Sequence, residues 1–288
     1  MIKLHCNSCD GKYLTSLDVR FTKQCDNNCP FCIEKNGIRA KMQDIDKMIE
    51  NTIKEKDRTT VLILGGEPFI EPDKLLKYVK GIRPYKKEIY ITTSLPKSFL
   101  NFENNEIKEI LNLIDGLNVS LNHYDSQLNN EIFQASSNHN RIKILSDLNK
   151  NYAKKIRVSI NLVKGLIDTK HKLLTAIFCL EKIGTKHIKI NELQHTPELY
   201  ISFEEITGIK LKSPFSHGCQ FEIDNDLLYT NMKITLKRAC FLVEPSRKAT
   251  FSDLLKIIIK KFNKKITTCK VVYENGKVSE GWIIKNEK

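Results

Sequence analysis

The sequence predicts an α/β protein, built as a partial (β/α)6 parallel barrel with a small C-terminal α+β appendage. Strand and helix patterns alternate at a spacing of roughly 30 residues, which is typical of consecutive βαβ units. One strand, residues 59–64, is a short continuous apolar run of the kind buried in parallel sheets. The alternation ends near residue 196. We therefore expect an N-terminal CxxC segment over residues 1–15, the barrel over 16–195 and the appendage over 196–288.

The elements of the barrel follow from hydrophobic periodicity. Alternating or continuous apolar runs predict strands at residues 16–22, 59–64, 88–93, 116–121, 156–163 and 187–193. Apolar residues near helical spacing predict helices at residues 41–55, 72–80, 103–114, 140–151 and 169–183. In barrels of this type, polar residues at the carboxyl ends of the strands line the active site.

The appendage is predicted as a hairpin, a helix and a second hairpin. The first hairpin covers residues 220–243, with Asp224-Asn225-Asp226 as its turn. The helix covers residues 250–263 and begins at a Thr or Ser cap. The second hairpin covers residues 266–284, where Asn275-Gly276 favours a type I′ turn.

Composition narrows the class of protein. Hydrophobic residues make up 41% of the 288 residues, enough for a sizeable core. The N-terminus has no apolar signal region, and no run of about 18 apolar residues occurs, so we expect a soluble, cytoplasmic protein that does not bind a membrane. Nine cysteines in such a chain favour metal ligation over disulfides. The net charge of +13 leaves a nucleic-acid partner open, but its lysines are scattered and not interleaved with stacking aromatics.

The first motif is Cys25-Asp26-Asn27-Asn28-Cys29-Pro30-Phe31-Cys32, directly after the first predicted strand. Three thiolates on one short loop suit a [4Fe-4S] cluster, because each can ligate one iron and the fourth iron stays open to a bound molecule. A zinc site would need a fourth ligand nearby, and three cysteines do not pair evenly into disulfides.

The second motif is Gly65-Gly66-Glu67-Pro68, at the end of the second predicted strand. Two glycines let a ligand approach the backbone closely, and the Glu67 carboxylate can accept hydrogen bonds from a cationic amine. Such a turn is weak evidence alone. Its position after the strand that follows the cysteine loop makes it specific.

Together the two motifs resemble the radical S-adenosylmethionine superfamily over roughly residues 16–195. Within it, Arg20-Phe21-Thr22-Lys23-Gln24-Cys25 and Leu64 through Phe69 look like the viperin and molybdenum-cofactor GTP cyclase group. The resemblance implies that Cys25, Cys29 and Cys32 hold a [4Fe-4S] cluster whose open iron chelates S-adenosylmethionine. One electron then cleaves the cofactor to methionine and a 5′-deoxyadenosyl radical, which abstracts a substrate hydrogen. An electron donor such as flavodoxin or ferredoxin is implied as well.

The resemblance also implies cofactor-binding residues. Phe31 would pack beside the adenine, and the Gly65-Gly66-Glu67-Pro68 turn would meet the methionine amino group. The remaining contacts, to the carboxylate, the ribose or other parts of the ligand, are implied for Thr92, Thr93, Ser120, Asn161 and Gln194.

The sequence departs from the family pattern in two places. Thr93-Ser94-Leu95 replaces the usual Thr-Asn-Gly, and Ser120-Leu121-Asn122 replaces Ser-Leu-Asp. His123, Tyr124 and His195 follow strand ends and are candidates to face the substrate.

The other cysteines raise the question of a second metal site. Cys179 lies on an apolar helix and is expected in the core. Five cysteines fall outside the barrel, and a second iron–sulfur cluster or a zinc ion could be held by Cys6, Cys9, Cys219 and Cys240, with Cys269 as a substitute.

The function predicted from these features is modification of a nucleotide or small metabolite by hydrogen abstraction. Two alternatives remain open at this point. One is a radical enzyme that modifies a peptide. The other is a basic iron–sulfur or zinc protein that binds RNA without catalysis.

Overall fold

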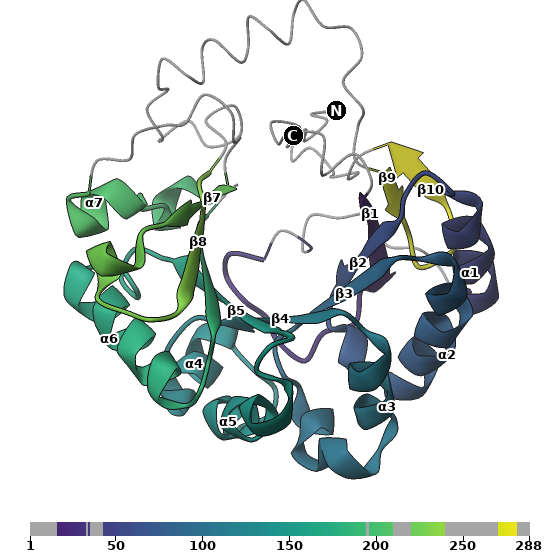
Figure 1. The fold of residues 1–288 in the computed structure, drawn as a ribbon, viewed down its shortest axis with the longest axis horizontal. Coiled ribbons are helices and arrows are strands. Elements are labelled where there is room, and N and C mark those ends of the chain that lie inside the picture. Colours follow the sequence, from purple (N-terminus) through teal and green to yellow (C-terminus); the bar gives the residue numbers. More distant parts are fainter. Residues whose placement is uncertain are drawn as a thin grey trace, which may run out of the picture.

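The structure is a computed structural model that describes residues 16–32, 34, 43–193, 196–209, 220–239 and 270–280. These residues form one ten-stranded sheet in the order β10-β9-β1-β2-β3-β4-β5-β6-β8-β7. The strands are β1 (Ser16–Thr22), β2 (Thr60–Gly65), β3 (Glu88–Thr93), β4 (Gly116–Leu121), β5 (Ile156–Leu162), β6 (His187–Glu192), β7 (Gln220–Ile223), β8 (Lys233–Lys237), β9 (Lys270–Val272) and β10 (Val278–Glu280). The sheet curves into an open arc with the helices on its outer side (Figure 1).

Strands β1 to β6 are parallel neighbours in chain order, which confirms the predicted partial barrel. Alternate residues face opposite sides of a strand. In β5, Ile156, Val158 and Ile160 are buried in the core, whereas Arg157 and Ser159 on the other face are only half-buried. We call this second face, which is turned away from the helices, the inner face.

The helices connect these strands. They are α1 (Ile45–Lys54), α2 (Pro72–Ile82), α3 (Glu106–Leu113), α4 (Ser126–Phe133), α5 (Arg141–Tyr152), α6 (Lys170–Lys182) and α7 (Phe203–Thr207). The predicted helices of the barrel are present, with later starts where a side chain caps the first turn. Asp44 accepts from Lys47 N ahead of α1, and Asn105 accepts from Ile107 N ahead of α3. Helix α4 was not predicted.

Both hairpins of the predicted appendage belong to the barrel sheet. Strand β8 pairs parallel with β6, and β9 pairs parallel with β1, so the hairpins extend the sheet at its two edges. The unpaired N–H and C=O groups of an edge strand explain this pairing. The division of the chain at residue 196 stays a prediction, and the expected helix over 250–263 lies outside the described residues.

The two turns differ from the tight turns expected. The 3-10 helix η7 (Asn225–Leu228) follows β7, and β8 begins only at Lys233. Asp224 caps this helix by accepting from Asp226 N, which explains why the chain does not turn back at once. In the second hairpin Gly276 has φ +78°, as a glycine turn requires, but the loop joins Val272 to Val278 and is longer than two residues.

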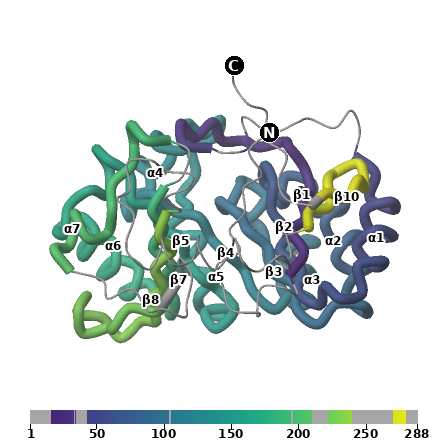
Figure 2. The backbone as a smooth tube through the Cα atoms, turned by 90° about the horizontal axis from the view of Figure 1, so that it is seen from above, coloured from purple at the N-terminus to yellow at the C-terminus, as the bar shows by residue number. Residues whose placement is uncertain are grey.

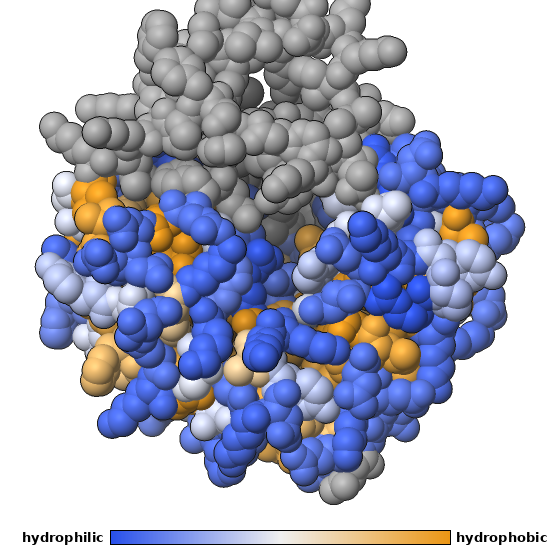
Figure 3. Space-filling view, in the orientation of Figure 1, coloured by the Kyte–Doolittle hydropathy of each residue, from blue (hydrophilic) through white to orange (hydrophobic). Residues whose placement is uncertain are grey.

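Hydrophilic side chains dominate the face of the molecule shown in Figure 3, while the apolar side chains of the strands lie between sheet and helices. Among the described residues, no helix is long and apolar enough to cross a membrane.

Candidate functional site

The three cysteines lie on the loop that leaves the carboxyl end of β1. Cys25 is exposed, whereas Cys29 and Cys32 are half-buried, and none of the three is in a disulfide. The amide of Cys32 donates to the carbonyl of Cys29 at 3.2 Å, so one turn carries these two thiols. Figure 2 shows the chain after β1 running across one end of the barrel toward α4.

The segment after α4 fixes this loop. The amide of Asn28 donates to the Phe133 carbonyl, and the amide of Ser136 donates to the Asp26 carbonyl, both at 2.8 Å. The Asn28 side chain donates to Gln134 Oε1 at 3.0 Å. Gln134 ends α4 in the left-handed conformation, with φ 47°. The cysteine loop is therefore held by backbone hydrogen bonds on both sides of Asn27.

A buried arginine, Arg141 at the start of α5, connects the loop to the sheet. Its Nε donates to the Ser94 carbonyl at 2.9 Å, and its Nη2 donates to Asn27 Oδ1 at 3.1 Å. Its Nη1 donates to Asn130 Oδ1. The guanidinium also lies over the Phe133 ring, 5.1 Å from its centroid. Because Arg141 is fully buried, these hydrogen bonds are essential to offset the cost of removing its charge from water.

Arg141 also brings positive charge close to the cysteines. Burial lowers the pKa of its guanidinium, and the anionic forms of Asp26, Glu67, Cys29 and Cys25 oppose that effect. A fixed cation close to Cys25 and Cys29 favours an anionic cluster at this loop.

The Gly65-Gly66 turn packs directly against the start of the cysteine loop. A Cβ on Gly66 would lie 2.1 Å from the Gln24 carbonyl oxygen, and Gly65 has φ +126°. The amide of Gly66 donates to the Thr22 carbonyl at 2.6 Å, and the amide of Glu67 donates to the Gln24 carbonyl at 2.7 Å. Among the described residues, the backbone that packs against these glycines belongs to the segment leading into Cys25.

The Glu67 carboxylate is buried and already has hydrogen-bond donors. It accepts from the Phe69 amide at 3.2 Å, from Thr93 Oγ1 at 2.8 Å, and from both the amide and the hydroxyl of Ser94 at 2.7 Å. Burial raises the pKa of Glu67 to about 7, although these hydrogen bonds act against the rise. Thr93 is buried with it, so both side chains join the β2 turn to the end of β3.

Other predicted contact residues lie on the inner face near the same end of the barrel. Thr92 and Ser120 are half-buried there. Asn161 belongs to a ladder of amides across three strands: its Nδ2 donates to Asn122 Oδ1 at 3.1 Å, and Asn191 Nδ2 donates to Asn161 Oδ1 at 3.3 Å. Asn122 is 1% exposed, and its Nδ2 has no hydrogen-bond partner within the described part of the chain. This donor is suited to an acceptor on a bound molecule.

Basic side chains continue the inner face toward β8. Arg157 on β5, Lys189 on β6 and Lys237 on β8 are half-buried there, and we call them the lumen cations. The strand register sets Ser159 beside Lys189, and Asn191 beside Lys237.

His187, at the start of β6, lies near two of these cations, Arg157 and Lys189, and pairs in register with Lys233. Burial lowers the pKa of His187 to about 4, and the charges of Arg157, Lys233 and Lys189 act in the same direction. His187 Nε2 lies 2.6 Å from Thr235 Oγ1, which places both on the inner face. The Glu222 carboxylate acts in the opposite direction, but the pKa stays low and His187 is neutral near pH 7.

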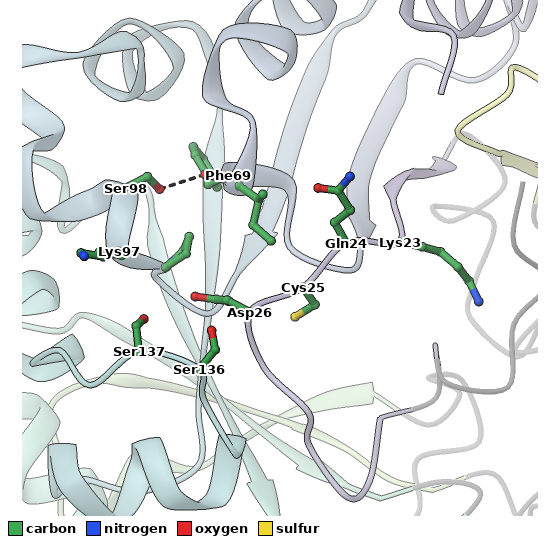
Figure 4. Close-up of a pocket in the computed structure, with 11 residues that line it drawn as sticks. Lys23, Gln24, Cys25, Asp26, Phe69, Lys97, Ser98, Ser136 and Ser137 are labelled. Carbon is green, nitrogen blue, oxygen red and sulfur yellow. Dashed lines mark hydrogen bonds between the residues drawn. The ribbon is translucent and has the colours of Figure 1, made fainter. Parts of the chain in front are cut away.

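A cleft of about 750 Å³ lies against the outer side of this site. It is lined by the start of the cysteine loop, by Phe69 and Ile70, by Pro96–Ser98, and by Ser136 and Ser137. Figure 4 shows Cys25 and Asp26 between the serines after α4 and the residues near Phe69, where Ser98 Oγ donates to the Phe69 carbonyl at 2.8 Å. Thr92, Ser120 and Asn161 do not line this cleft, so it is distinct from the inner face.

The donor set is suited to an iron–sulfur cluster by its chemistry, because all three candidate ligands are cysteine thiols. No three His, Cys, Asp or Glu side chains converge as ligands of one metal ion within the described ranges. A cubane cluster spreads its cysteine ligands because each binds a different iron. The structure places Cys25, Cys29 and Cys32, none of them in a disulfide, on one braced loop beside a buried guanidinium.

Several predicted residues cannot be placed. Gln194, His195 and the five cysteines of the expected second site (Cys6, Cys9, Cys219, Cys240 and Cys269) lie outside the described residues.

The remaining candidates are placed by the structure. Phe31 is half-buried on the cysteine loop. His123 and Tyr124 stack with ring centroids 4.3 Å apart. Cys179, expected in the core, is half-buried on α6.

Comparison with known proteins identifies the family of this chain. The Radical SAM superfamily profile matches residues 19–179, more than half of the chain, and the chain therefore belongs to that superfamily. It is a radical S-adenosylmethionine enzyme, and this family implies a [4Fe-4S] cluster and S-adenosylmethionine as cofactors.

Two curated relatives are named probable GTP 3′,8-cyclase. The one from Pyrococcus abyssi (strain GE5 / Orsay) is 29% identical over 118 residues, which cover 40% of this chain and 37% of the relative. The one from Pyrococcus horikoshii is 26% identical over 118 residues, covering 40% and 36%. The match thus spans little more than a third of the length of these relatives.

Solved structures share the fold. Streptococcus suis SuiB superimposes with a TM-score of 0.56 at 20% identity, over 92% of this chain and 59% of that chain. A radical SAM methyltransferase from Sphaerobacter thermophilus gives 0.56 at 14% identity, over 77% and 65%. The structure of anSMEcpe with bound AdoMet and Cp18Cys peptide gives 0.54 at 15% identity, over 92% and 73%.

Proposed function

We propose that this enzyme uses radical chemistry to abstract hydrogen from a small anionic substrate, with a phosphate-bearing nucleotide as the first candidate. The observation that carries this proposal is the set of lumen cations, Arg157, Lys189 and Lys237, on the inner face of the barrel. Arg and Lys side chains at a partly buried site favour phosphate or carboxylate groups. The naming of two relatives as probable GTP 3′,8-cyclases supports the same class of substrate.

The residues around the cysteine loop suit the family's cofactors. When bound, the cluster and S-adenosylmethionine supply a one-electron cleavage that yields the 5′-deoxyadenosyl radical. Cys25, Cys29 and Cys32 are proposed as the cluster ligands. The Glu67 carboxylate accepts hydrogen bonds from the protein itself, so the methionine amino group is better matched by backbone carbonyls of the Gly65-Gly66-Glu67-Pro68 turn.

The inner face provides the remaining cofactor contacts. Thr92 and Ser120 present hydroxyls, and the amide ladder presents the unsatisfied Nδ2 of Asn122 beside Asn161. These groups orient a polar ligand without adding charge. Thr93 is assigned a supporting role, because its hydroxyl donates to Glu67 and accepts from the Leu95 amide. Phe31 and Gln194 stay predicted contacts.

Formation of 5′-deoxyadenosine tests the proposal. Anaerobically loaded protein, a reductant and S-adenosylmethionine are incubated with nucleoside triphosphates, uncharged nucleosides or acidic peptides. We expect stimulation by the phosphorylated compounds and little by the nucleosides. Stimulation only by peptides would favour the peptide-modifying alternative, and salt-sensitive RNA binding without turnover would favour the binding protein.

Variants of the lumen cations sharpen the test. Lys189→Gln and Arg157→Gln are expected to raise the KM for the anionic substrate about tenfold each, because charged hydrogen bonds contribute about 1.5–3 kcal/mol. Lys54→Gln is the matched control, since Lys54 is exposed and pairs with Glu50 on the surface. Equal KM values in all three variants would contradict an anionic substrate at this position.

A further inference from the structure

One buried ion pair joins the hairpin formed by β9 and β10 to β1, the strand that leads into the cysteine loop. Arg20, on the inner face of β1, donates from Nε to Glu274 Oε2 at 2.7 Å and from Nη2 to Glu274 Oε1 at 2.9 Å. Glu274 lies in the hairpin loop after β9. Both side chains are buried, Arg20 at 2% and Glu274 at 5% exposure. A bidentate pair of this kind fixes the guanidinium plane.

The same guanidinium faces the far end of the cysteine loop. Arg20 Nη1 lies 3.9 Å from Glu34 Oε2, and Glu34 is two residues beyond Cys32. That oxygen is buried and makes no hydrogen bond within the described part of the chain. Two cations therefore act on Glu34 where the loop leaves the site: Arg20 faces its carboxylate, and Lys23 Nζ donates to its backbone carbonyl at 3.1 Å.

Arg20 has little freedom to move. Its guanidinium lies over the Tyr273 ring, 4.4 Å from the centroid, so the hairpin covers one side of it. A Cβ on Gly65 would lie 3.1 Å from Arg20 Cγ, so the Gly65-Gly66 turn crowds its stem. The hairpin is itself anchored to α1, where Asn51 Nδ2 donates to the Gly276 carbonyl at 2.9 Å.

We propose that Glu274 is a positioning residue for the cluster-binding loop, acting through Arg20 on Glu34. The C-terminal hairpin thereby holds the exit of the cysteine loop, while Arg141 and the segment after α4 hold its middle. Loss of the Glu274 charge frees Arg20 to reorient, and the segment that carries Cys32 loses its fixed anchor.

The proposal is tested first in iron-free, full-length protein, by the rate of alkylation of Cys32 relative to Cys179 in peptide mass spectra. Glu274→Gln is expected to speed Cys32 alkylation about tenfold, because removing one partner of a buried ion pair promotes local opening. Glu274→Asp, which keeps the charge, should restore most of the protection. Asn51→Ala is the matched control: it removes a hairpin contact without touching the ion pair, and should stay within about twofold of wild type.

A double variant tests the route through Arg20. Glu34→Gln should also speed alkylation, and its effect should not add to that of Glu274→Gln, because both act on one guanidinium. Should Glu274→Gln fail to fold, Arg20→Met combined with Glu274→Leu removes both charges and carries the same expectation. Wild-type alkylation rates in Glu274→Gln, or equal acceleration in Asn51→Ala, would overturn the proposal.

Iron release provides the second readout and rests on the proposed cluster. In anaerobically loaded protein, Glu274→Gln should lose iron to a chelator several-fold faster than wild type, in parallel with its alkylation rate. If wild-type protein takes up no iron at these cysteines, the assignment of the cluster fails, and the alkylation rates still decide the role of Glu274.

Discussion

Gly66 packs so closely against the start of the cysteine loop that no side chain fits at this position. A Cβ at this position would lie 2.1 Å from the Gln24 carbonyl oxygen, which cannot yield without moving Cys25. We expect Gly66→Ala to cost at least about 2 kcal/mol of stability and to abolish most iron uptake. Iron content after anaerobic reconstitution measures the effect.

Gly165→Ala is the control for this change. A Cβ at Gly165 meets nothing within 4 Å, although φ is +88° there, so alanine suffers backbone strain only. That variant should bind iron as wild type does. Full iron uptake by Gly66→Ala would show that the turn is not required to seat the loop.

Glu67 links stability to pH at the same turn. Its pKa rises from 4.5 to about 7 on burial, so the folded state holds a proton over a range where the unfolded state has lost it. Stability should therefore fall as pH rises from about 4.5 to about 7, by roughly 3 kcal/mol at about 1.4 kcal/mol per pH unit. Urea unfolding across this range measures the slope.

Glu67→Gln provides the comparison. It cannot titrate, so its stability curve should lack the fall, even though the amide is less stable among four donors. Parallel curves for wild type and variant would assign the pH dependence to other groups.

Residue type and spacing identify these residues as candidates for the site but do not determine all of their contacts. The sequence predicts that the glycines admit a ligand, and the structure adds a contact that the sequence does not indicate, the protein's own backbone packed against them. Glu67 was expected to contact an amine, but its carboxylate is turned toward Thr93 and Ser94. Such contacts depend on the packing of neighbouring strands, which residue type and spacing do not determine.

At the level of elements, α4 and the start of α5 form the seat of the cysteine loop. Arg141 is buried there with hydrogen bonds to Ser94, Asn27 and Asn130. Arg141→Met would leave the oxygens of both asparagines without this donor, so we expect a loss of roughly 3 kcal/mol or more. Lys143→Met, at an exposed ion pair with Asp147 in the same helix, should cost less than about 1 kcal/mol.

Denaturant unfolding of iron-free protein measures both variants, so that loss of metal does not enter the comparison. An Arg141→Met variant as stable as Lys143→Met would contradict the role of Arg141 as the link between loop and sheet.

The elements themselves were largely readable from the sequence, for a physical reason. Strands with a buried face and helices with an apolar stripe leave local patterns, although the caps Asp44 and Asn105 start α1 and α3 later than apolar spacing predicts. Helix α4 does not, because its buried positions include Asn129 and Asn130, which hide the apolar periodicity. Those asparagines are buried for polar contacts: Asn129 accepts from the Asn122 amide, and Asn130 accepts from Arg141.

Over the whole molecule, pairing between distant segments was the least predictable feature. The second hairpin has a clear turn signal at Gly276, yet its pairing with β1 joins residues about 250 positions apart, such as Leu17 and Lys270. The net charge of +13 does not indicate where on the molecule the excess of basic side chains lies. In the folded sheet, three of these side chains, Arg157, Lys189 and Lys237, lie on the inner face.

The metal content of the whole chain tests both predicted metal sites. Substituting Cys25, Cys29 and Cys32 together by alanine should remove about four irons and four sulfides per chain, the content of one cubane. Iron that remains would belong to a second site, for which the sequence offers Cys6, Cys9, Cys219, Cys240 and Cys269. A wild-type content of about eight irons falling to about four would identify a second cluster, and retained zinc would identify a structural zinc ion.

The matched control for this measurement is Cys179→Ala. Cys179 lies half-buried on α6, outside both groups of cysteines, and its loss should leave iron and zinc unchanged. Iron content equal to wild type in the triple variant would contradict the assignment of the cysteine loop as the cluster site. Because the count is made on protein without added S-adenosylmethionine or substrate, it separates metal binding from turnover, and so tests the loop independently of the proposed reaction.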